Sequence, residues 1–123
     1  MAEKKRILIV DDDTEIRDLL EFDIASSGYF VDTASDGMEG LTKALNNKYD
    51  LILLDVMMPK INGYKICRLL KFDNKYKNIP IIMITARSQD EDKMIGEETG
   101  ADEYITKPFE FSEVLEKINK YLA

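Results

Sequence analysis

Polar side chains that suit metal and phosphate chemistry stand directly after short, mostly apolar runs of this sequence. A carboxylate can bind a hard divalent cation, while a lysine and a threonine can donate hydrogen bonds to an anionic group. The runs and the groups that follow or close them are residues 7–10 with Asp11 and Asp12, residues 51–54 with Asp55, residues 81–84 with Thr85, and residues 103–106 with Lys107. These groups can act together only if the chain brings four segment ends to one place.

The apolar runs have the character of buried strands. Residues 7–10 and 51–54 are continuous Ile, Leu and Val sequences, which are typical of strands buried on both faces of a parallel sheet. Pro59 prevents the strand that ends near Asp55 from continuing. Between the runs, apolar residues recur at helical spacing. The predicted strands are residues 7–10, 29–34, 51–54, 81–84 and 103–106, and the predicted helices are at about 14–27, 37–45, 64–71, 88–99 and 111–122.

Strand and helix alternate five times with short connections, and this order constrains the fold. It requires right-handed crossovers and a parallel sheet covered on both faces. The sequence therefore predicts an α/β domain with a five-stranded parallel sheet flanked by five helices, in the doubly wound, flavodoxin-like arrangement. If the strand order is 2-1-3-4-5, a switch point lies between the first and third strands, and ligands bind at such points. Asp11 and Asp12 would then face Asp55.

The buried face of each helix is predicted from the spacing of its apolar residues. Asp13 or Thr14 can cap the first helix, and Asp36 with Glu39 has the form of a capping box for the second. The apolar positions assigned to buried faces are Ile16, Leu19, Leu20 and Ile24, then Met38, Leu41 and Leu45, then Ile66, Leu69 and Leu70, and finally Phe111, Val114, Leu115, Ile118 and Leu122. Cys67 is interpreted as a small packing residue.

Composition narrows the possible functions. The 123 residues are expected to form one domain, residues 1–123, with a net charge of −7 that disfavours nucleic acid and anionic membranes as direct partners. No apolar run approaches the ~20 residues of a membrane-spanning helix. Histidine is absent, which excludes serine–histidine or cysteine–histidine catalysis and a histidine-bound zinc. One cysteine cannot form an internal disulfide, and a cytoplasmic location is predicted.

Three carboxylates at one switch point repel one another, and a divalent cation would offset that repulsion. Ligation by oxygen alone, with positions left for water and phosphate, suits Mg²⁺. Thr85 and Lys107 would then supply a hydroxyl and a cation for a phosphoryl group. The combination predicts a magnesium-dependent site for a phosphoryl group at the carboxyl edge of the sheet.

The sequence resembles the receiver domains of bacterial two-component response regulators over essentially its whole length. The matching motifs are Val10-Asp-Asp12, Leu54-Asp55 with Met58-Pro59, Gly63, Thr85-Ala86, Gly100-Ala101 and Lys107-Pro108-Phe109. The resemblance implies that Asp55 accepts a phosphoryl group from a phosphohistidine on a sensor histidine kinase or phosphotransfer protein. It also implies Mg²⁺ ligation by Asp12, Asp55 and the backbone carbonyl of Met57, with Asp11 acting through water.

The remaining roles also come from this resemblance. Thr85, with Ala86 beside it, and Lys107 would contact the phosphoryl group, and Lys107-Pro108 would be a cis peptide. Tyr104 would turn inward as an aromatic switch, and the fourth helix, fifth strand and fifth helix would form the output face. The lifetime-modulating positions, two residues after Asp55 and Thr85, are Met57 and Arg87. Methionine cannot orient an attacking water, so slow self-dephosphorylation is predicted.

Receivers attached to winged-helix DNA-binding domains are the subgroup that the sequence resembles most. That likeness implies a phosphorylation-dependent homodimer, with Asp102 and Lys117 as a candidate ion pair between subunits. The domain would be a regulatory phosphoacceptor rather than an enzyme with its own substrate, although it would catalyse its own phosphotransfer and slow dephosphorylation. The sequence leaves open whether the domain acts alone or belongs to a longer regulator.

Two other classes of function are less compatible with these residues. An aspartyl-phosphate hydrolase typically needs a second aspartate two residues after the nucleophile, and here that residue is Met57. A flavodoxin-like FMN-binding module would share the sheet order. Its phosphate loop, however, requires bare amides and hydroxyls where this chain has Asp11 and Asp12.

Overall fold

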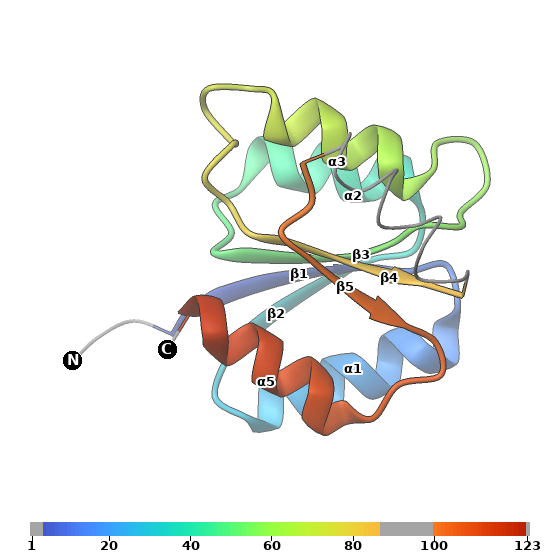
Figure 1. Ribbon diagram of the computed structural model, residues 1–123, viewed down its shortest axis with the longest axis vertical. Coiled ribbons are helices and arrows are strands. Elements are labelled where there is room, and N and C mark those ends of the chain that lie inside the picture. The colour runs from blue at the N-terminus through green and yellow to red at the C-terminus, as the bar shows by residue number, and fades with distance from the viewer. Residues whose placement is uncertain (1–3, 87–99, 123) are drawn as a thin grey trace.

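The structure is a computed structural model that describes residues 4–86 and 100–122, and Figure 1 shows one sheet between two layers of helices. The strands are β1 Arg6–Val10, β2 Phe30–Ala34, β3 Leu51–Asp55, β4 Ile81–Thr85 and β5 Glu103–Thr106. The described helices are α1 Thr14–Ser26, α2 Gly37–Asn46, α3 Gly63–Lys71 and α5 Phe111–Leu122. All five predicted strands are confirmed. The predicted helix at residues 88–99 lies outside the described residues.

All strand pairs are parallel, in the order β2-β1-β3-β4-β5, which confirms the predicted fold class. β1 lies beside β3 with Val10 opposite Leu54. The chain leaves β1 into α1 on one face of the sheet and leaves β3 into α3 on the other (Figure 1). The loops after β1 and β3 therefore diverge and leave a crevice at the carboxyl edge.

The core consists of two clusters, one on each face of the sheet, because successive strand residues point to opposite faces. Leu8 and Val10 of β1 belong to the cluster that includes α2 and α3 residues. Ile7 and Ile9 belong to the cluster with α1 and α5 residues. Figure 1 shows these two helix pairs on opposite sides of the sheet. Burial on both faces explains why these strands are continuous apolar sequences.

Four predictions about buried helix faces are wrong. Leu19, Met38, Leu45 and Leu69 are 58%, 52%, 45% and 49% exposed. The buried positions of α2 are instead the small residues Gly37, Gly40 and Ala44. A Cβ on Gly40 would lie 2.7 Å from a methyl carbon of Val10, so α2 lies too close to β1 for large side chains on that face.

The ends of the helices agree with the predicted caps. The Asp13 side chain accepts a hydrogen bond from Ile16 N–H at the start of α1, and Asp36 accepts one from Glu39 N–H at the start of α2. Asn62 caps α3 in the same way through Lys65 N–H. Within residues 4–86 and 100–122, none of the helices has the length and apolar character that crossing a bilayer requires.

Candidate functional site

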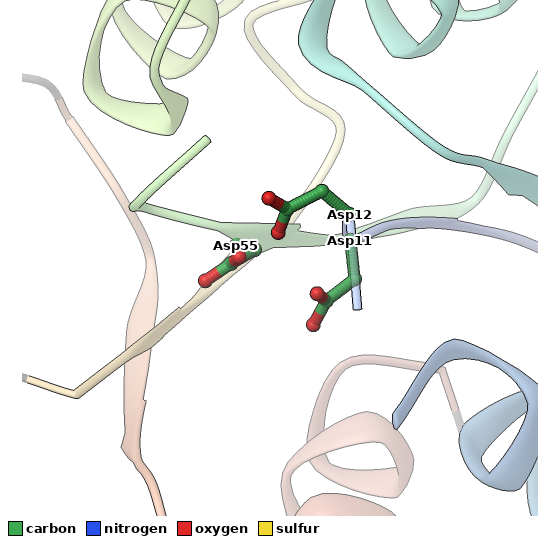
Figure 2. Close-up of side chains that lie close together, drawn as sticks. All are labelled: Asp11, Asp12 and Asp55. Atoms are coloured by element: carbon green, nitrogen blue, oxygen red, sulfur yellow. The ribbon is translucent and has the colours of Figure 1, made fainter. Parts of the chain in front are cut away.

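The three predicted carboxylates lie together at the carboxyl edge of the sheet. Asp11 and Asp12 follow β1, and Asp55 is the last residue of the adjacent strand β3. One carboxylate oxygen from each lies within 4.8 Å of the other two. Figure 2 shows the three side chains gathered around the ends of the two strands. The side chain of Asp12 is exposed, whereas Asp11 and Asp55 are 0% and 4% exposed.

Backbone contacts hold Asp11 in place. Its N–H donates to the carbonyl oxygen of Ala34 at 3.1 Å, and its Oδ1 accepts a hydrogen bond of 2.9 Å from Asp13 N–H. Its buried Oδ2 accepts no hydrogen bond from any residue that the structure describes. Lys107 Nζ lies 3.5 Å from this oxygen, at the limit of a hydrogen bond, so the oxygen can still accept a ligand.

Lys107, which follows the edge strand β5, brings a positive charge to these carboxylates. Its Nζ lies 3.5 Å from Asp11 Oδ2 and 3.5 Å from Asp55 Oδ1, and its side chain is 20% exposed. The backbone N–H of Lys107 donates to the carbonyl oxygen of Thr85 at 2.7 Å, so the ends of β4 and β5 are joined. The Lys107–Pro108 peptide bond is cis, as the resemblance implied.

The carboxylates are electrostatically unfavourable without a cation. Burial and then the charge of Asp11 raise the pKa of Asp55 to about 7, although Lys107 acts in the opposite direction. Burial also raises the pKa of Asp11, against the opposing effects of the Asp13 N–H and of Lys107. One ammonium group therefore does not fully offset the charge of this cluster.

The donor set fits Mg²⁺. It consists of carboxylate oxygens close enough to share one ion, and Asp11 Oδ2 lacks a hydrogen bond among the described residues. Magnesium prefers hard oxygen ligands and retains waters, which agrees with a site whose Asp12 side chain is exposed. Asp11, Asp12 and Asp55 are the described residues that could hold such an ion.

The loop after β3 is held close to Asp55 by Gly63. A Cβ on Gly63 would collide with the backbone carbonyl oxygen of Asp55, so only glycine lets α3 begin so near the strand. Gly63 N–H also donates to the carbonyl oxygen of Val56 at 3.0 Å. Met57 lies in this loop with 53% of its side chain exposed. Its side chain can therefore be changed with little loss of packing.

Of the other predicted site residues, Thr85 and Ala86 lie at the carboxyl edge, whereas Tyr104 lies within β5 opposite Met83, away from that edge. Thr85 ends β4 and is buried, and Ala86 follows it as an exposed residue. Tyr104 in β5 is partly buried against the core cluster that contains α2 and α3 residues. Arg87 lies outside the described residues.

The two residues predicted to pair across a dimer both have partners within the chain. Lys71 Nζ lies 2.8 Å from Asp102 Oδ2, which also accepts a hydrogen bond from Ile81 N–H. Lys117 Nζ lies 3.3 Å from Glu103 Oε1. An ion pair between Asp102 and Lys117 of two subunits would have to compete with these contacts.

One contact in the site is not predicted by the sequence. Arg17 of α1 donates a hydrogen bond of 2.8 Å from Nη1 to the backbone carbonyl oxygen of Asp11. The available signal was a basic residue within the first turn of a predicted helix, where the helix dipole disfavours positive charge.

The fold and the site define a flavodoxin-like α/β domain with a cluster of three carboxylates at its switch point. The chain matches the response regulator receiver domain family over residues 7–119, and it belongs to that family. It is therefore a receiver domain of the two-component response regulators, which are phosphorylation-activated switches, and its role is regulatory.

Two relatives and one solved structure illustrate the similarity. The chain is 46% identical to response regulator ArlR of Staphylococcus aureus over 117 residues, covering 95% of this chain and 52% of ArlR. It is 43% identical over 117 residues to the DNA-binding dual master transcriptional regulator RpaA of Synechocystis, covering 95% and 48%. Chemotaxis protein CheY4 of Vibrio cholerae has a TM-score of 0.91 at 33% identity, covering 97% of this chain and 99% of that one. The chain spans about half the length of ArlR and RpaA.

Proposed function

We propose that this receiver domain accepts a phosphoryl group on Asp55 from the phosphohistidine of a histidine kinase or phosphotransfer protein, in a Mg²⁺-dependent reaction. The observation that carries the proposal is the surroundings of Asp55. Its carboxylate lies at a strand end beside two further carboxylates and 3.5 Å from a lysine ammonium. The carboxylates favour a hard cation, and the lysine favours an anion. A phosphoryl group together with its metal ion satisfies both requirements.

The chemistry assigned to the chain follows from these positions. A carboxylate oxygen of Asp55 forms a bond to phosphorus while the P–N bond of the donor breaks, and the imidazole leaves with the electron pair. The rigid end of β3 orients the nucleophile, and Lys107 offsets charge on the incoming phosphoryl oxygens. Asp12, Asp55 and the carbonyl of Met57 would hold Mg²⁺, with Asp11 acting through water, and the ion would supply further charge neutralisation. The domain thereby catalyses its own phosphorylation and its slow dephosphorylation.

The output proposed for this site is a change in the face formed by the fourth helix, β5 and α5. Thr85 would hydrogen-bond the phosphoryl group, with Ala86 beside it, and Tyr104 would follow by turning inward. Residues 88–99, assigned to the fourth helix, lie outside the described residues. β5 is joined to α5 through Glu103, which lies 3.3 Å from Lys117 Nζ and 3.1 Å from Lys120 Nζ. A displacement of β5 would therefore be transmitted to α5 through these ion pairs.

The wider role is proposed from the relatives. RpaA is described as a DNA-binding transcriptional regulator, and this chain aligns with about half of it. We assign this domain to a regulator of that kind, in which phosphorylation promotes a homodimer and a separate domain binds DNA. A cytoplasmic location is part of the same proposal. The chain does not fit an aspartyl-phosphate hydrolase, because residue 57, where that enzyme needs a second aspartate, is methionine.

The test uses acetyl phosphate, a small phosphodonor, and intact-protein mass spectrometry. Wild-type protein is expected to gain the mass of one phosphoryl group with Mg²⁺ and none when the metal is removed by EDTA. The added group should be lost at alkaline pH, because an acyl phosphate is labile. No gain of mass, or an equal gain with EDTA, would refute the proposal.

Met57→Asn should shorten the half-life of the phosphorylated domain. An amide can orient a water toward phosphorus, which a thioether cannot, and positioning of this kind is expected to be worth on the order of tenfold. The side chain is 53% exposed, so the substitution should leave the fold intact. Met57→Leu is the control and should decay like the wild type. Equal half-lives for Met57→Asn and Met57→Leu would show that this position does not control lifetime.

A further inference from the structure

Arg17 holds both ends of the short loop that carries Asp11 and Asp12. Its side chain donates from Nη1 to the carbonyl oxygen of Asp11 at 2.8 Å. Its backbone N–H donates to the carbonyl oxygen of Asp13 at 2.9 Å. The backbone bond is the first i→i−4 bond of α1 and would form with any residue but proline at position 17, so the side-chain bond to Asp11 is the contact that requires arginine.

The side-chain bond fixes the direction of the peptide plane between Asp11 and Asp12. A peptide unit is planar, so anchoring the carbonyl of Asp11 also sets the N–H and Cα of Asp12. The opposite side of Asp11 is already fixed, because its N–H donates to Ala34. Figure 2 shows Asp11 and Asp12 leaving the end of β1 with their carboxylates on the side of Asp55. Without Arg17 this peptide plane would lose a hydrogen bond that restricts its rotation.

A positive charge at position 17 is unfavourable for the stability of α1 itself. α1 begins at Thr14, so Arg17 lies at the end of its first turn, where the partial positive charge of the helix disfavours a cation. Asp13 and Glu15 are the charges that suit this helix end, and Arg17 breaks the pattern. A residue that breaks a local preference commonly has a role outside its own element.

We propose that Arg17 is a positioning residue for the metal site: its guanidinium holds the Asp11–Asp12 peptide so that both carboxylates converge on the ion. This role deepens the proposed function and depends on it, since it assumes that the acidic cluster binds Mg²⁺. Arg17 acts through the backbone, as a residue outside the direct ligand set that orients the ligands. Loss of such a residue typically weakens metal binding by 10- to 100-fold.

The effect is one of geometry rather than of charge. Lys107 and Asp12 act on the carboxyl groups of both Asp11 and Asp55, and the charge of Asp11 also acts on Asp55. The guanidinium of Arg17 is directed at a carbonyl oxygen instead. A lysine at position 17, which keeps a donor on a long side chain, should therefore restore the function of arginine.

The experiment measures the dissociation constant for Mg²⁺ by calorimetric titration of the whole chain, for the wild type and four variants. Arg17→Met and Arg17→Ala remove the donor with different side-chain volumes, and both should bind Mg²⁺ on the order of tenfold more weakly. Arg17→Lys should bind within about threefold of the wild type. Arg68→Met is the matched control, because it removes the same charge from α3, where Arg68 lies 5.7 Å from the Phe72 ring. It should bind like the wild type.

The outcomes separate the two proposals. Wild-type affinity in both donor-free variants would overturn the role of Arg17, and so would an Arg17→Lys variant as weak as Arg17→Met. An equal loss of Mg²⁺ affinity in Arg68→Met would show that net charge causes the effect, and it would also overturn the positioning role of Arg17. Arg17→Met should still be phosphorylated on Asp55 when Mg²⁺ is raised to saturate it. Wild-type protein that binds no Mg²⁺ would instead overturn the metal site of the proposed function, and the role of Arg17 with it.

Discussion

Asp55→Asn is expected to abolish the Mg²⁺-dependent gain of a phosphoryl group from acetyl phosphate. The amide has nearly the same shape as the carboxylate, so the 4% exposed side chain keeps its place at the end of β3. It lacks the negative oxygen that attacks phosphorus, and it contributes one negative charge less to the metal site. The loss should be complete at any Mg²⁺ concentration, as measured by intact mass.

The same substitution should not unfold the metal-free domain. Burial and the charge of Asp11 disfavour the ionised form of Asp55 and raise its pKa to about 7. A neutral amide therefore removes an unfavourable negative charge from the folded state. The melting temperature of Asp55→Asn without Mg²⁺ should therefore equal or exceed that of the wild type. This result would separate loss of the nucleophile from loss of the fold.

Asp18→Asn is the matched control for this experiment. It is the same chemical change on an exposed residue of α1, and it should be phosphorylated like the wild type. Phosphorylation of Asp55→Asn at the wild-type level would place the acceptor elsewhere and refute the assignment of Asp55. A gain of mass by the wild type that is absent from both variants would show that the readout responds to more than this site.

Much of the fold could be predicted because the strands are buried on both faces. A strand such as β3, between α3 on one side and α5 on the other, has no polar face, and its sequence is therefore continuous Leu and Ile. The location of the site could be predicted from the same apolar strands. Parallel strands end at one edge, so the residues directly after apolar runs had to lie near one another.

The helix faces could not be predicted as well, because spacing alone does not give the distance between a helix and a sheet. The spacing of Met38 and Leu45 in α2 predicts that both side chains face the core. The helix instead packs through Gly40 and Ala44, because the side chain of Val10 fills the space beneath it. The close approach is visible only once β1 and α2 are placed together.

Two features of the site also depended on tertiary structure. The position of Lys107 after β5 predicts that it lies at this edge, but not that its ammonium lies 3.5 Å both from Asp11, which follows β1, and from Asp55 of β3. The bond from Arg17 to the carbonyl of Asp11 joins a side chain to a backbone group, and no spacing of residue types encodes such a contact. The sequence indicates that the carboxylates, Thr85 and Lys107 share one edge of the sheet, but not the backbone contact by which Arg17 holds Asp11.

The charge of the acidic cluster leads to a prediction for Asp12→Ala. Asp12 is exposed, and its side chain makes no hydrogen bond or ion pair with any residue that the structure describes, so little is lost when it is removed. Its charge repels Asp11 and Asp55, and relief of this repulsion should stabilise the metal-free domain by about 1 kcal/mol. For a domain of this size that is a rise of about 3 °C in melting temperature.

Mg²⁺ should stabilise the wild type much more than this variant. A ligand that binds only the folded state adds about 2.7 kcal/mol when its concentration is 100 times its dissociation constant. Asp12→Ala removes one of the carboxylates proposed to bind the ion, so most of that stabilisation should disappear. Thermal unfolding is measured by circular dichroism with and without Mg²⁺, with ionic strength held constant by KCl.

Asp18→Ala is the control for Asp12→Ala, because it removes the same charge from the exposed face of α1. It should leave both the metal-free melting temperature and the Mg²⁺-induced shift close to those of the wild type. A full Mg²⁺ shift in Asp12→Ala would exclude Asp12 from the ligand set. A variant that is less stable than the wild type without Mg²⁺ would mean that Asp12 supports the loop before α1 rather than the ion, since relief of charge repulsion can only act in the opposite direction.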